Sequence, residues 1–187
     1  YTNEVINGDI HTSNQVAAGL GSRDEAKTFI YAFIYGAGNK KIGTIIGGSE
    51  RDGERVKEKF LRATPSLRRL REKVERVAQR RWVRGLDQRK IIIRHPHAAL
   101  NTLLQGAGAC VMKKALTILQ EYVINKQIKA FPVVNVHDEF QYEVQEDRAD
   151  EFGRLAVQSI IDAGQQLNVR CQLNGEYKIG NNWSETH

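Results

Sequence analysis

Cysteine is scarce in this sequence, and long apolar runs are absent from it. The two cysteines, Cys110 and Cys171, stand far apart and form no C-x-x-C pair. This excludes a disulfide scaffold and a cysteine-based zinc site, and it indicates a reducing compartment. No apolar run approaches the roughly 18–20 residues that span a bilayer, so a membrane-spanning protein is excluded. The N-terminus lacks the basic and apolar pattern of a secretion signal, and we therefore expect a cytoplasmic protein.

An initiator methionine is also missing, because the sequence begins at Tyr1. We therefore expect a piece of a longer polypeptide or one subunit of a split protein. The 187 residues, of which 41% are apolar, suffice for one domain with a real core or for two small lobes. Ordinary apolar content and recurring helical spacing exclude a disordered chain.

Positive charge is concentrated in one stretch. The net charge is +6, and residues 51–94 alone carry 16 Lys and Arg against 6 Asp and Glu. Twelve of those 16 cations are Arg, which binds phosphate groups in a bidentate manner. Such a stretch indicates a polyanion, most commonly nucleic acid. The alternative is a solvated helical face, because glutamates interleave with the cations as ion-pair partners would.

Helical spacing dominates the first 80 residues, and strand patterns appear only after them. The first helix is capped by Thr12 or Ser13 and ends near Leu20, whereas the second is capped by Ser22 and stopped by Gly36. The pattern predicts two packed lobes, residues 1–80 and residues 81–187. Further helices are predicted over 50–62, 65–80, 96–126 and 147–167, a β-hairpin over 82–94, and strands over 131–136, 140–144 and 169–179.

Four side chains recur at every fourth position of the predicted helix that follows Ser22. They are Arg23, Lys27, Tyr31 and Tyr35. Steps of four residues keep side chains on one broad helix face. The two cations near the helix N-terminus would meet the oxygens of a triphosphate, and a base or sugar would stack on the tyrosines. The alternative is an ordinary amphipathic helix with interfacial tyrosines.

A second set, His137, Asp138 and Glu139, lies between two short predicted strands. A turn between strands holds a carboxylate rigidly and exposes it. Adjacent carboxylates on a strand point apart, so one would bind a metal while the other supports it or meets substrate. Hard oxygen ligands suit Mg²⁺, which usually takes one or two protein carboxylates together with substrate phosphates. The alternative is a charged hairpin turn without a metal.

A third set combines Arg94 with His97, Asn101 and Gln105, and the last three recur at every fourth position of a predicted helix. Their imidazole and amide groups suit the minor-groove acceptors of DNA. All correct base pairs share those acceptors, so such contacts read geometry more than sequence. The alternative is a polar helix face without a nucleic-acid partner.

The three sets together resemble the C-terminal part of family A DNA polymerases, most like the bacteriophage T-seven type, over essentially the whole sequence. The letters RDEAKTFIY at residues 23–31, followed by YGAG at residues 35–38, resemble the fingers motif called motif B. The letters VHDE at residues 136–139 resemble palm motif C. GDIHT at residues 8–12 and PHAALNTLLQ at residues 96–105 resemble intervening family segments. Four ordered matches at sensible separations are far more specific than any one of them.

The resemblance implies a nucleotide-binding role for the first set. His11, Arg23 and Lys27 would bind the phosphates of an incoming deoxynucleotide. Tyr31 would lie beside its sugar, and Tyr35 would stack at the templating position. Arg23 and Lys27 would also neutralise the leaving pyrophosphate, with Lys27 counted among the catalytic residues.

The resemblance assigns the other two sets to metal and DNA. Asp138 would bind Mg²⁺, two ions in the complete enzyme, with Glu139 supporting it and His137 near the primer end. Trp183 and the terminal His187 resemble a C-terminus that returns toward the active site in the phage enzymes. The residues that would track the nascent duplex are Arg94, His97, Asn101 and Gln105.

The implied fold is α+β: helical fingers over 1–80 and a partial antiparallel palm sheet with flanking helices over 81–187, an incomplete right-hand polymerase fold. The family's second metal-binding aspartate, from motif A, would precede Gly8, where only seven residues stand. We therefore expect this polypeptide to be inactive alone. It would need an upstream polymerase polypeptide carrying the exonuclease, thumb and motif A. Its other partners would be a DNA primer-template and dNTP, in the host cell cytoplasm if the protein is phage-encoded.

Two other functions stay open at this point. One is a non-catalytic nucleic-acid-binding subunit of a replication complex, using the cationic stretch 51–94 and the helix face over 94–105. The other is an assembly subunit that docks on a partner. A binding module has no need for a triphosphate row together with a metal carboxylate, and this favours the enzyme.

Overall fold

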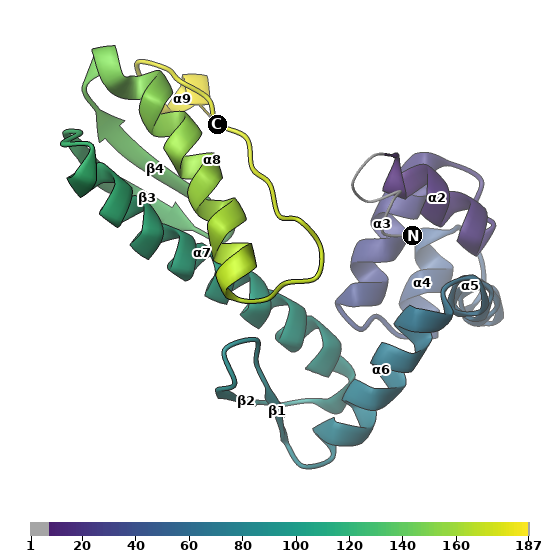
Figure 1. The fold of residues 1–187 in the computed structure, drawn as a ribbon. Coiled ribbons are helices and arrows are strands. Elements are labelled where there is room, and N and C mark those ends of the chain that lie inside the picture. The colour runs from purple at the N-terminus through teal and green to yellow at the C-terminus, as the bar shows by residue number, and fades with distance from the viewer. Residues whose placement is uncertain (1–7, 187) are drawn as a thin grey trace. The chain divides into compact units, whose positions relative to one another are not determined.

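The computed structural model describes residues 8–186, which form helices and two small antiparallel sheets (Figure 1). They divide into two compact units. The first runs up to Gly85 and includes Lys90–Leu104, and the second comprises Leu86–Arg89 and the chain from Gln105 onward. Helices combined with small antiparallel sheets confirm the α+β class, while the functional division into lobes at residue 80 stays a prediction. No helix among the described residues is both long and apolar enough to cross a membrane.

An aromatic cluster forms the centre of the first unit. Phe29, Phe33 and Phe60 are each at most 3% exposed. The Phe60 ring stands edge-on to the other two rings, at centroid distances of 5.3 and 5.4 Å, which is a favoured aromatic arrangement. Five helices surround this cluster: α2 (Ile10–Ala18), α3 (Arg23–Ile34), α4 (Asn39–Ile45), α5 (Glu50–Ala63) and α6 (Pro65–Ala78).

The start of α3 is fixed by a capping box. The Ser22 hydroxyl accepts a hydrogen bond from the backbone N–H of Glu25 at 3.1 Å, and the Glu25 carboxylate accepts one from the backbone N–H of Ser22 at 3.2 Å. This pair satisfies two backbone donors that a helix terminus leaves open. The predicted beginning of this helix at Arg23 is confirmed.

The start of α2 differs from the prediction. Asp9, rather than Thr12 or Ser13, is the N-cap, because its carboxylate accepts from the backbone N–H groups of His11 and Thr12. A carboxylate at an N-cap also interacts favourably with the helix dipole. The earlier cap places Thr12 and Ser13 inside the helix.

The short helix α4 has no counterpart among the expected elements. It packs against α5 through glycines. A Cβ atom at Gly53 would lie 2.1 Å from the carbonyl oxygen of Asn39, and one at Gly43 would lie 2.2 Å from the carbonyl oxygen of Ser49. Backbone therefore meets backbone at this contact, which only glycine permits at such a distance.

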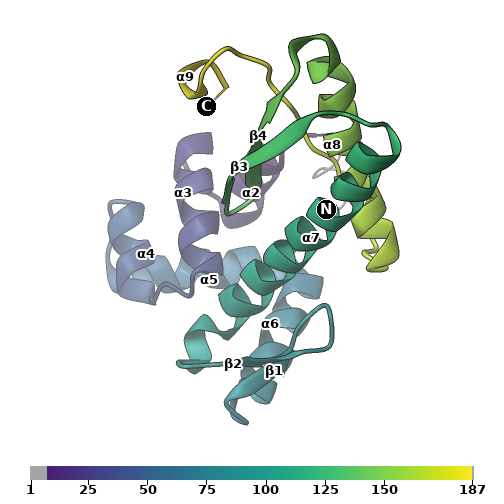
Figure 2. The same cartoon turned by 90° about the vertical axis from the view of Figure 1, so that its left-hand side faces the viewer.

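The predicted hairpin after the helices is confirmed. Strand β1 (Trp82–Arg84) pairs antiparallel with β2 (Lys90–Ile92). Figure 2 shows this hairpin beside α6, and the two share a small core in which Val83 packs with Val74 and Ala78. A 3₁₀ turn, η1 (Pro96–Ala98), then leads into the long helix α7 (Ala99–Asn125).

The second unit places helices on one face of a hairpin. Leu119 and Val123 of α7 pack with Phe152 and Ala156 of the later helix α8 (Ala149–Gln166), and partly buried side chains of the hairpin over 130–144 close this core. The predicted strands over 131–136 and 140–144 are confirmed as a pair, although the pairing is irregular between Pro132 and Val134. The elements are β3 (Ala130–Val136), β4 (Glu139–Val144), η2 (Glu146–Arg148), α8 (Ala149–Gln166) and α9 (Trp183–Thr186).

The strands expected over 169–179 are wrong. These residues are all described, and they form no strand. Their side chains pack on α8 instead: a Cβ atom at Gly153 would lie 2.2 Å from the Tyr177 ring, and one at Gly164 would lie 2.9 Å from Leu173. Alternating side chains predict a strand only where a neighbouring backbone is available to pair with it, and here the neighbour is a helix.

Candidate functional site

The first predicted set lies along the exposed face of α3. Arg23, Lys27, Tyr31 and Tyr35 are all exposed, Tyr31 by 51% and Tyr35 by 56%. The opposite face of the helix buries the phenylalanines of the core. The helical period thus separates a polar and aromatic row from the buried row, as the spacing predicts.

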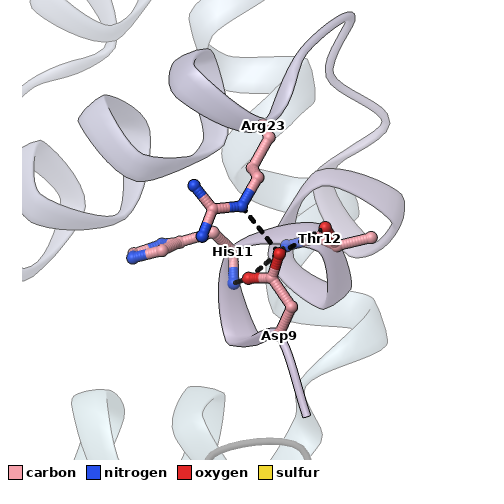
Figure 3. Close-up of polar contacts among 4 residues, drawn as sticks. All are labelled: Asp9, His11, Thr12 and Arg23. Atoms are coloured by element: carbon pink, nitrogen blue, oxygen red, sulfur yellow. Dashed lines mark hydrogen bonds and ion pairs between the residues drawn. The ribbon is translucent and has the colours of Figure 1, made fainter.

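Helix α2 brings His11 to this row. The ring centroids of His11 and Tyr31 are 6.4 Å apart. Figure 3 shows the imidazole beside the Arg23 guanidinium. The guanidinium is bound through its Nε, which donates to Oδ2 of Asp9 at 2.7 Å. Asp9 belongs to the GDIHT segment, but nothing in the sequence pattern indicates this contact.

The polar contacts around Asp9 have clear electrostatic consequences. Arg23, together with the Thr12 hydroxyl, holds the pKa of the Asp9 carboxyl well below its usual range, and Asp9 in turn raises the pKa of the Arg23 guanidinium. Both shifts favour the charged form of each group, so the ion pair is fully charged at neutral pH. The carboxylate of Asp9 is therefore fixed beside the first cation of α3, whose first turn also carries Asp24 and Glu25.

The two ring nitrogens of His11 differ in their surroundings. Its Nδ1 is buried and has no hydrogen-bond partner among the described residues. A buried N–H without an acceptor is rarer in proteins than an unused acceptor. We therefore place the lone pair of the neutral ring on Nδ1 and the proton on Nε2, which makes Nε2–H the available donor.

The second predicted set forms the turn between β3 and β4. His137 and Asp138 are exposed, and Glu139 is half-buried, with Oε1 accepting a hydrogen bond from Nε2 of Gln141 at 2.6 Å. The backbone of His137 has a φ of +54°. This left-handed conformation is uncommon outside glycine. Such conformations concentrate at functional sites, which makes the turn a candidate on its own geometry.

A groove of about 690 Å³ in the second unit includes this turn. Asp138 and Glu139 contribute to its wall, together with β4, α8 and residues 176–180. Tyr177 is held in that wall by donating its hydroxyl hydrogen to Asp150 at 2.6 Å. The groove places a carboxylate turn next to an apolar surface.

The carboxylate of Asp138 fits one ligand position of Mg²⁺. It is an exposed hard oxygen donor on a two-residue turn, and the ion usually takes only one or two protein carboxylates. Within residues 8–186, no three or more His, Cys, Asp or Glu side chains gather into a metal-binding group. Asp138 is therefore a candidate ligand that the described residues do not complete into a full set.

The third predicted set is divided between two elements. His97 lies in η1, and Asn101 and Gln105 are one helical turn apart in α7, so the expected single helix over all three is wrong at its beginning. Arg94 and His97 are exposed, and Asn101 is half-buried. The rings of His95 and His97 stack at a centroid distance of 5.5 Å.

The end of α3 touches the third set. A Cβ atom at Gly36, whose φ is +81°, would lie 2.4 Å from the carbonyl oxygen of His97. Tyr35 therefore ends its helix directly against the segment that carries His97. Sequence spacing gave no signal for this contact, because the residues are far apart in the chain.

The C-terminal prediction is only partly described. Trp183 begins α9 and is 62% exposed. His187 lies outside the described residues.

The fold has a clear counterpart among solved structures. It matches the structure described as the POL domain of Pol1 from M. smegmatis in complex with DNA primer-template and dNTP, with a TM-score of 0.76 and 18% sequence identity. The match covers 84% of this chain and 32% of that chain. The architecture is therefore that of a polymerase domain, present in part.

The sequence comparisons identify the family. The model of DNA polymerase family A matches residues 7–185. The chain belongs to DNA polymerase family A. The DNA-directed DNA polymerases of Enterobacteria phage T3 and Escherichia phage T7 are each 41% identical to it over 213 residues, covering 100% of this chain and 30% of each relative. The resemblance drawn from the motifs is confirmed, and the chain spans about 30% of the length of these relatives.

Proposed function

We propose that this chain carries the nucleotide-binding surface and one metal-binding carboxylate of a DNA-directed DNA polymerase. The observation that carries the proposal is the position of His11, whose ring lies beside the Arg23 guanidinium (Figure 3) and 6.4 Å from the ring of Tyr31 between centroids. The spacing of Arg23, Lys27, Tyr31 and Tyr35 is compatible with a triphosphate there, and the family resemblance implies one. Because the chain spans 30% of the length of its phage relatives, the activity of a whole polymerase is part of the proposal.

The first unit binds the incoming deoxynucleotide. Arg23 and Lys27 meet the phosphate oxygens near the N-terminus of α3, where the helix dipole also favours an anion. His11 adds a donor from Nε2. Tyr31 lies beside the sugar, and Tyr35 stacks at the templating position. The two cations hold the charge that develops on pyrophosphate as its bond to the α-phosphorus breaks.

The second unit contributes to the reacting end of the primer. Asp138 would hold Mg²⁺ through its carboxylate, Glu139 would support that carboxylate, and His137 would lie near the primer terminus. Bound Mg²⁺ would acidify the primer 3′-hydroxyl and neutralise phosphate charge. The 3′-oxygen forms the new bond to the α-phosphorus, the hydroxyl proton leaves, and pyrophosphate departs.

The proposal includes a DNA contact. Arg94, His97, Asn101 and Gln105 follow the nascent duplex with donors suited to minor-groove acceptors. The solved structure that shares this fold is described as a complex with DNA primer-template and dNTP, which supports both ligands for this chain.

A nucleotide titration tests the binding proposal. The affinity for dATP is measured with and without Mg²⁺ in the wild type and in the variants Lys27→Ala and Asp138→Ala. The matched control is Lys40→Ala, which removes an exposed cation from α4. We expect Lys27→Ala to weaken binding about tenfold, roughly 1.4 kcal/mol, and Asp138→Ala to weaken it only with Mg²⁺. Equal affinities in all four proteins would contradict the proposal.

A primer-extension assay tests the catalytic part. In this proposal the second metal-binding aspartate comes from polypeptide outside these 187 residues, so the purified chain alone does not extend a primer. Addition of a polypeptide that supplies the family's motif A, thumb and exonuclease regions restores extension. Extension by the verified chain alone would show that this part of the proposal is wrong.

A second candidate function, nucleic-acid binding without catalysis, is favoured by the β1–β2 hairpin. Arg84 and Lys90 stand directly opposite each other in the register, and like charges in that position oppose pairing. Both cations lie over the Trp82 ring, at 5.9 and 4.8 Å from its centroid. Two cations held together on a strand pair would suit a phosphate backbone. Duplex binding with a steep salt dependence, but without any dATP binding, would favour this second function.

A further inference from the structure

One carboxylate connects the two helices that carry the candidate triphosphate residues. Asp9 stands at the start of α2, directly before the turn that holds His11 (Figure 3). Its Oδ2 accepts a hydrogen bond from Nε of Arg23 at 2.7 Å. Arg23 is the first residue of α3, fourteen positions later in the chain. The ion pair therefore links the beginnings of both helices.

The position of this carboxylate is fixed by its own helix. Oδ1 accepts from the backbone N–H of His11 at 3.0 Å and from that of Thr12 at 3.4 Å. Oδ2 also accepts from the Thr12 hydroxyl at 2.9 Å. With both oxygens engaged in the first turn of α2, Asp9 is a rigid acceptor, and the long Arg23 side chain adapts to it.

The contact uses only one edge of the guanidinium. A guanidinium has five N–H donors in one plane, and Asp9 takes the Nε donor. The two terminal nitrogens of Arg23 have no partner among the described residues. The edge formed between these two nitrogens faces away from Nε, and its paired donors have the fork geometry that binds phosphate in a bidentate manner.

We propose that Asp9 is a positioning residue: by holding Nε of Arg23 it directs the two terminal nitrogens of the guanidinium to a phosphate of the incoming nucleotide. The inference rests on the proposed function of Arg23. An exposed ion pair of this kind adds little to fold stability, and the backbone cap of α2 does not need the charge. A side chain that is already held in its binding geometry loses less conformational freedom when the ligand arrives.

A simple charge effect predicts the opposite sign. A carboxylate close to a phosphate repels it, so removal of the Asp9 charge should strengthen binding if repulsion dominates. If positioning dominates, the same change weakens binding. The sign of the effect therefore separates the two explanations.

The variant Asp9→Asn tests the proposal without removing the helix cap. Asparagine caps helices as well as aspartate does, but its amide nitrogen cannot accept from Nε of Arg23. The matched control is Asp52→Asn. Asp52 also belongs to the N-terminal cap of a helix and pairs with an arginine, Arg55, at 2.8 Å. Each variant removes one carboxylate and one ion pair from the first unit.

The readout is the dissociation constant of dATP in the presence of Mg²⁺, measured on the full chain. It is measured for four variants: Asp9→Asn, Asp52→Asn, Arg23→Gln and the double variant Asp9→Asn/Arg23→Gln. Unfolding in urea shows whether each variant folds, and the ¹⁵N NMR signal of Arg23 Nε–H reports the contact itself. We expect Asp9→Asn to weaken dATP binding about tenfold. Removal of a residue that orients a metal ligand causes losses of about this size, and Asp9 would orient Arg23 in the same way. Asp52→Asn leaves binding unchanged. The Asp9→Asn effect disappears in the Arg23→Gln background.

Each outcome decides a different claim. Unchanged or tighter dATP binding by Asp9→Asn, with binding weakened by Arg23→Gln, overturns the positioning role and leaves the proposed function intact. An equal loss from Asp9→Asn with and without Arg23 also overturns it, because the effect would not pass through the guanidinium. An Arg23→Gln variant that binds dATP like the wild type overturns both this inference and the use of Arg23 in the proposed function.

Discussion

Glycine makes tight contacts in both units, but the contacts are of two kinds. In the first unit, a Cβ atom at Gly53 would lie 2.1 Å from the Asn39 carbonyl oxygen. In the second unit, a Cβ atom at Gly153 would lie 2.2 Å from the ring of Tyr177. A carbonyl oxygen within a helix cannot move without moving the helix, whereas a ring rotates or leaves. The first contact is therefore part of the fold, and the second attaches a segment to it.

The largest effect is expected from Gly53→Ala. Alanine favours a helix by roughly 1 kcal/mol over glycine, but its Cβ would overlap the backbone of α4. We expect a net loss of about 3 kcal/mol in the free energy of unfolding, the upper part of the range for overpacked sites. Urea denaturation measures it. The control is Gly108→Ala in α7, where nothing lies within 4 Å of the added atom, and a gain of about 0.5–1 kcal/mol is expected.

A smaller and local effect is expected from Gly153→Ala. The added Cβ displaces the Tyr177 ring, which also loses its hydrogen bond to Asp150. We expect the segment over 169–182 to detach, with a loss of about 1–2 kcal/mol. Faster hydrogen exchange confined to that segment would report the detachment. The double variant Gly153→Ala/Tyr177→Ala should be no less stable than Tyr177→Ala alone. A further loss in the double variant would show that the clash involves the backbone.

The same contrast explains what the sequence predicts and what it does not. The exposed row on α3 is predictable because the capping box and the helical period are both local, and Ser22 and Glu25 stand three residues apart. The Asp9–Arg23 pair joins two elements across a loop, and no local pattern encodes it. The contact of Gly36 with the His97 carbonyl joins residues that lie even farther apart in the sequence.

The failed strand prediction has the same origin. Val169, Cys171 and Leu173 alternate with polar residues as a strand would, yet pairing depends on a neighbour that the alternation does not specify. The missed helix α4 is short, and it depends on Gly43 and Gly53 to approach α5. Local patterns predicted the elements that need no distant partner. Tertiary contacts determine the structure of α4 and of the segment over 169–179.

The pH dependence of stability tests how side chains join α7 to α8. The Tyr122 hydroxyl donates to Asp162, and this bond together with burial raises the pKa of Tyr122 to about 12. This pKa is higher than the value near 10 that tyrosine has in the unfolded chain. The contribution of the hydrogen bond to the free energy of unfolding is therefore fully present below pH 10 and is lost as the pH rises toward 12. Tyr122→Phe should cost about 1 kcal/mol at pH 7. Its unfolding free energy should lack the wild-type decline between pH 10 and 12. A parallel decline in the variant would assign the effect to other groups.

The smallest expected change in stability separates strain from function at the β3–β4 turn. His137 and Gln127 both have a left-handed φ, +54° and +53°. Glycine relieves that strain in the folded state, but it also raises the conformational entropy of the unfolded chain. We expect the relief to be the larger of the two, so that the free energy of unfolding rises by about 0.5 kcal/mol. His137→Gly and Gln127→Gly should therefore stabilise the chain equally in urea. Only His137→Gly should reduce primer extension in the complemented assay, because only its ring is proposed to lie near the primer end. An equal loss of extension in both variants, or none in either, would remove His137 from the site and leave its backbone conformation as ordinary turn geometry.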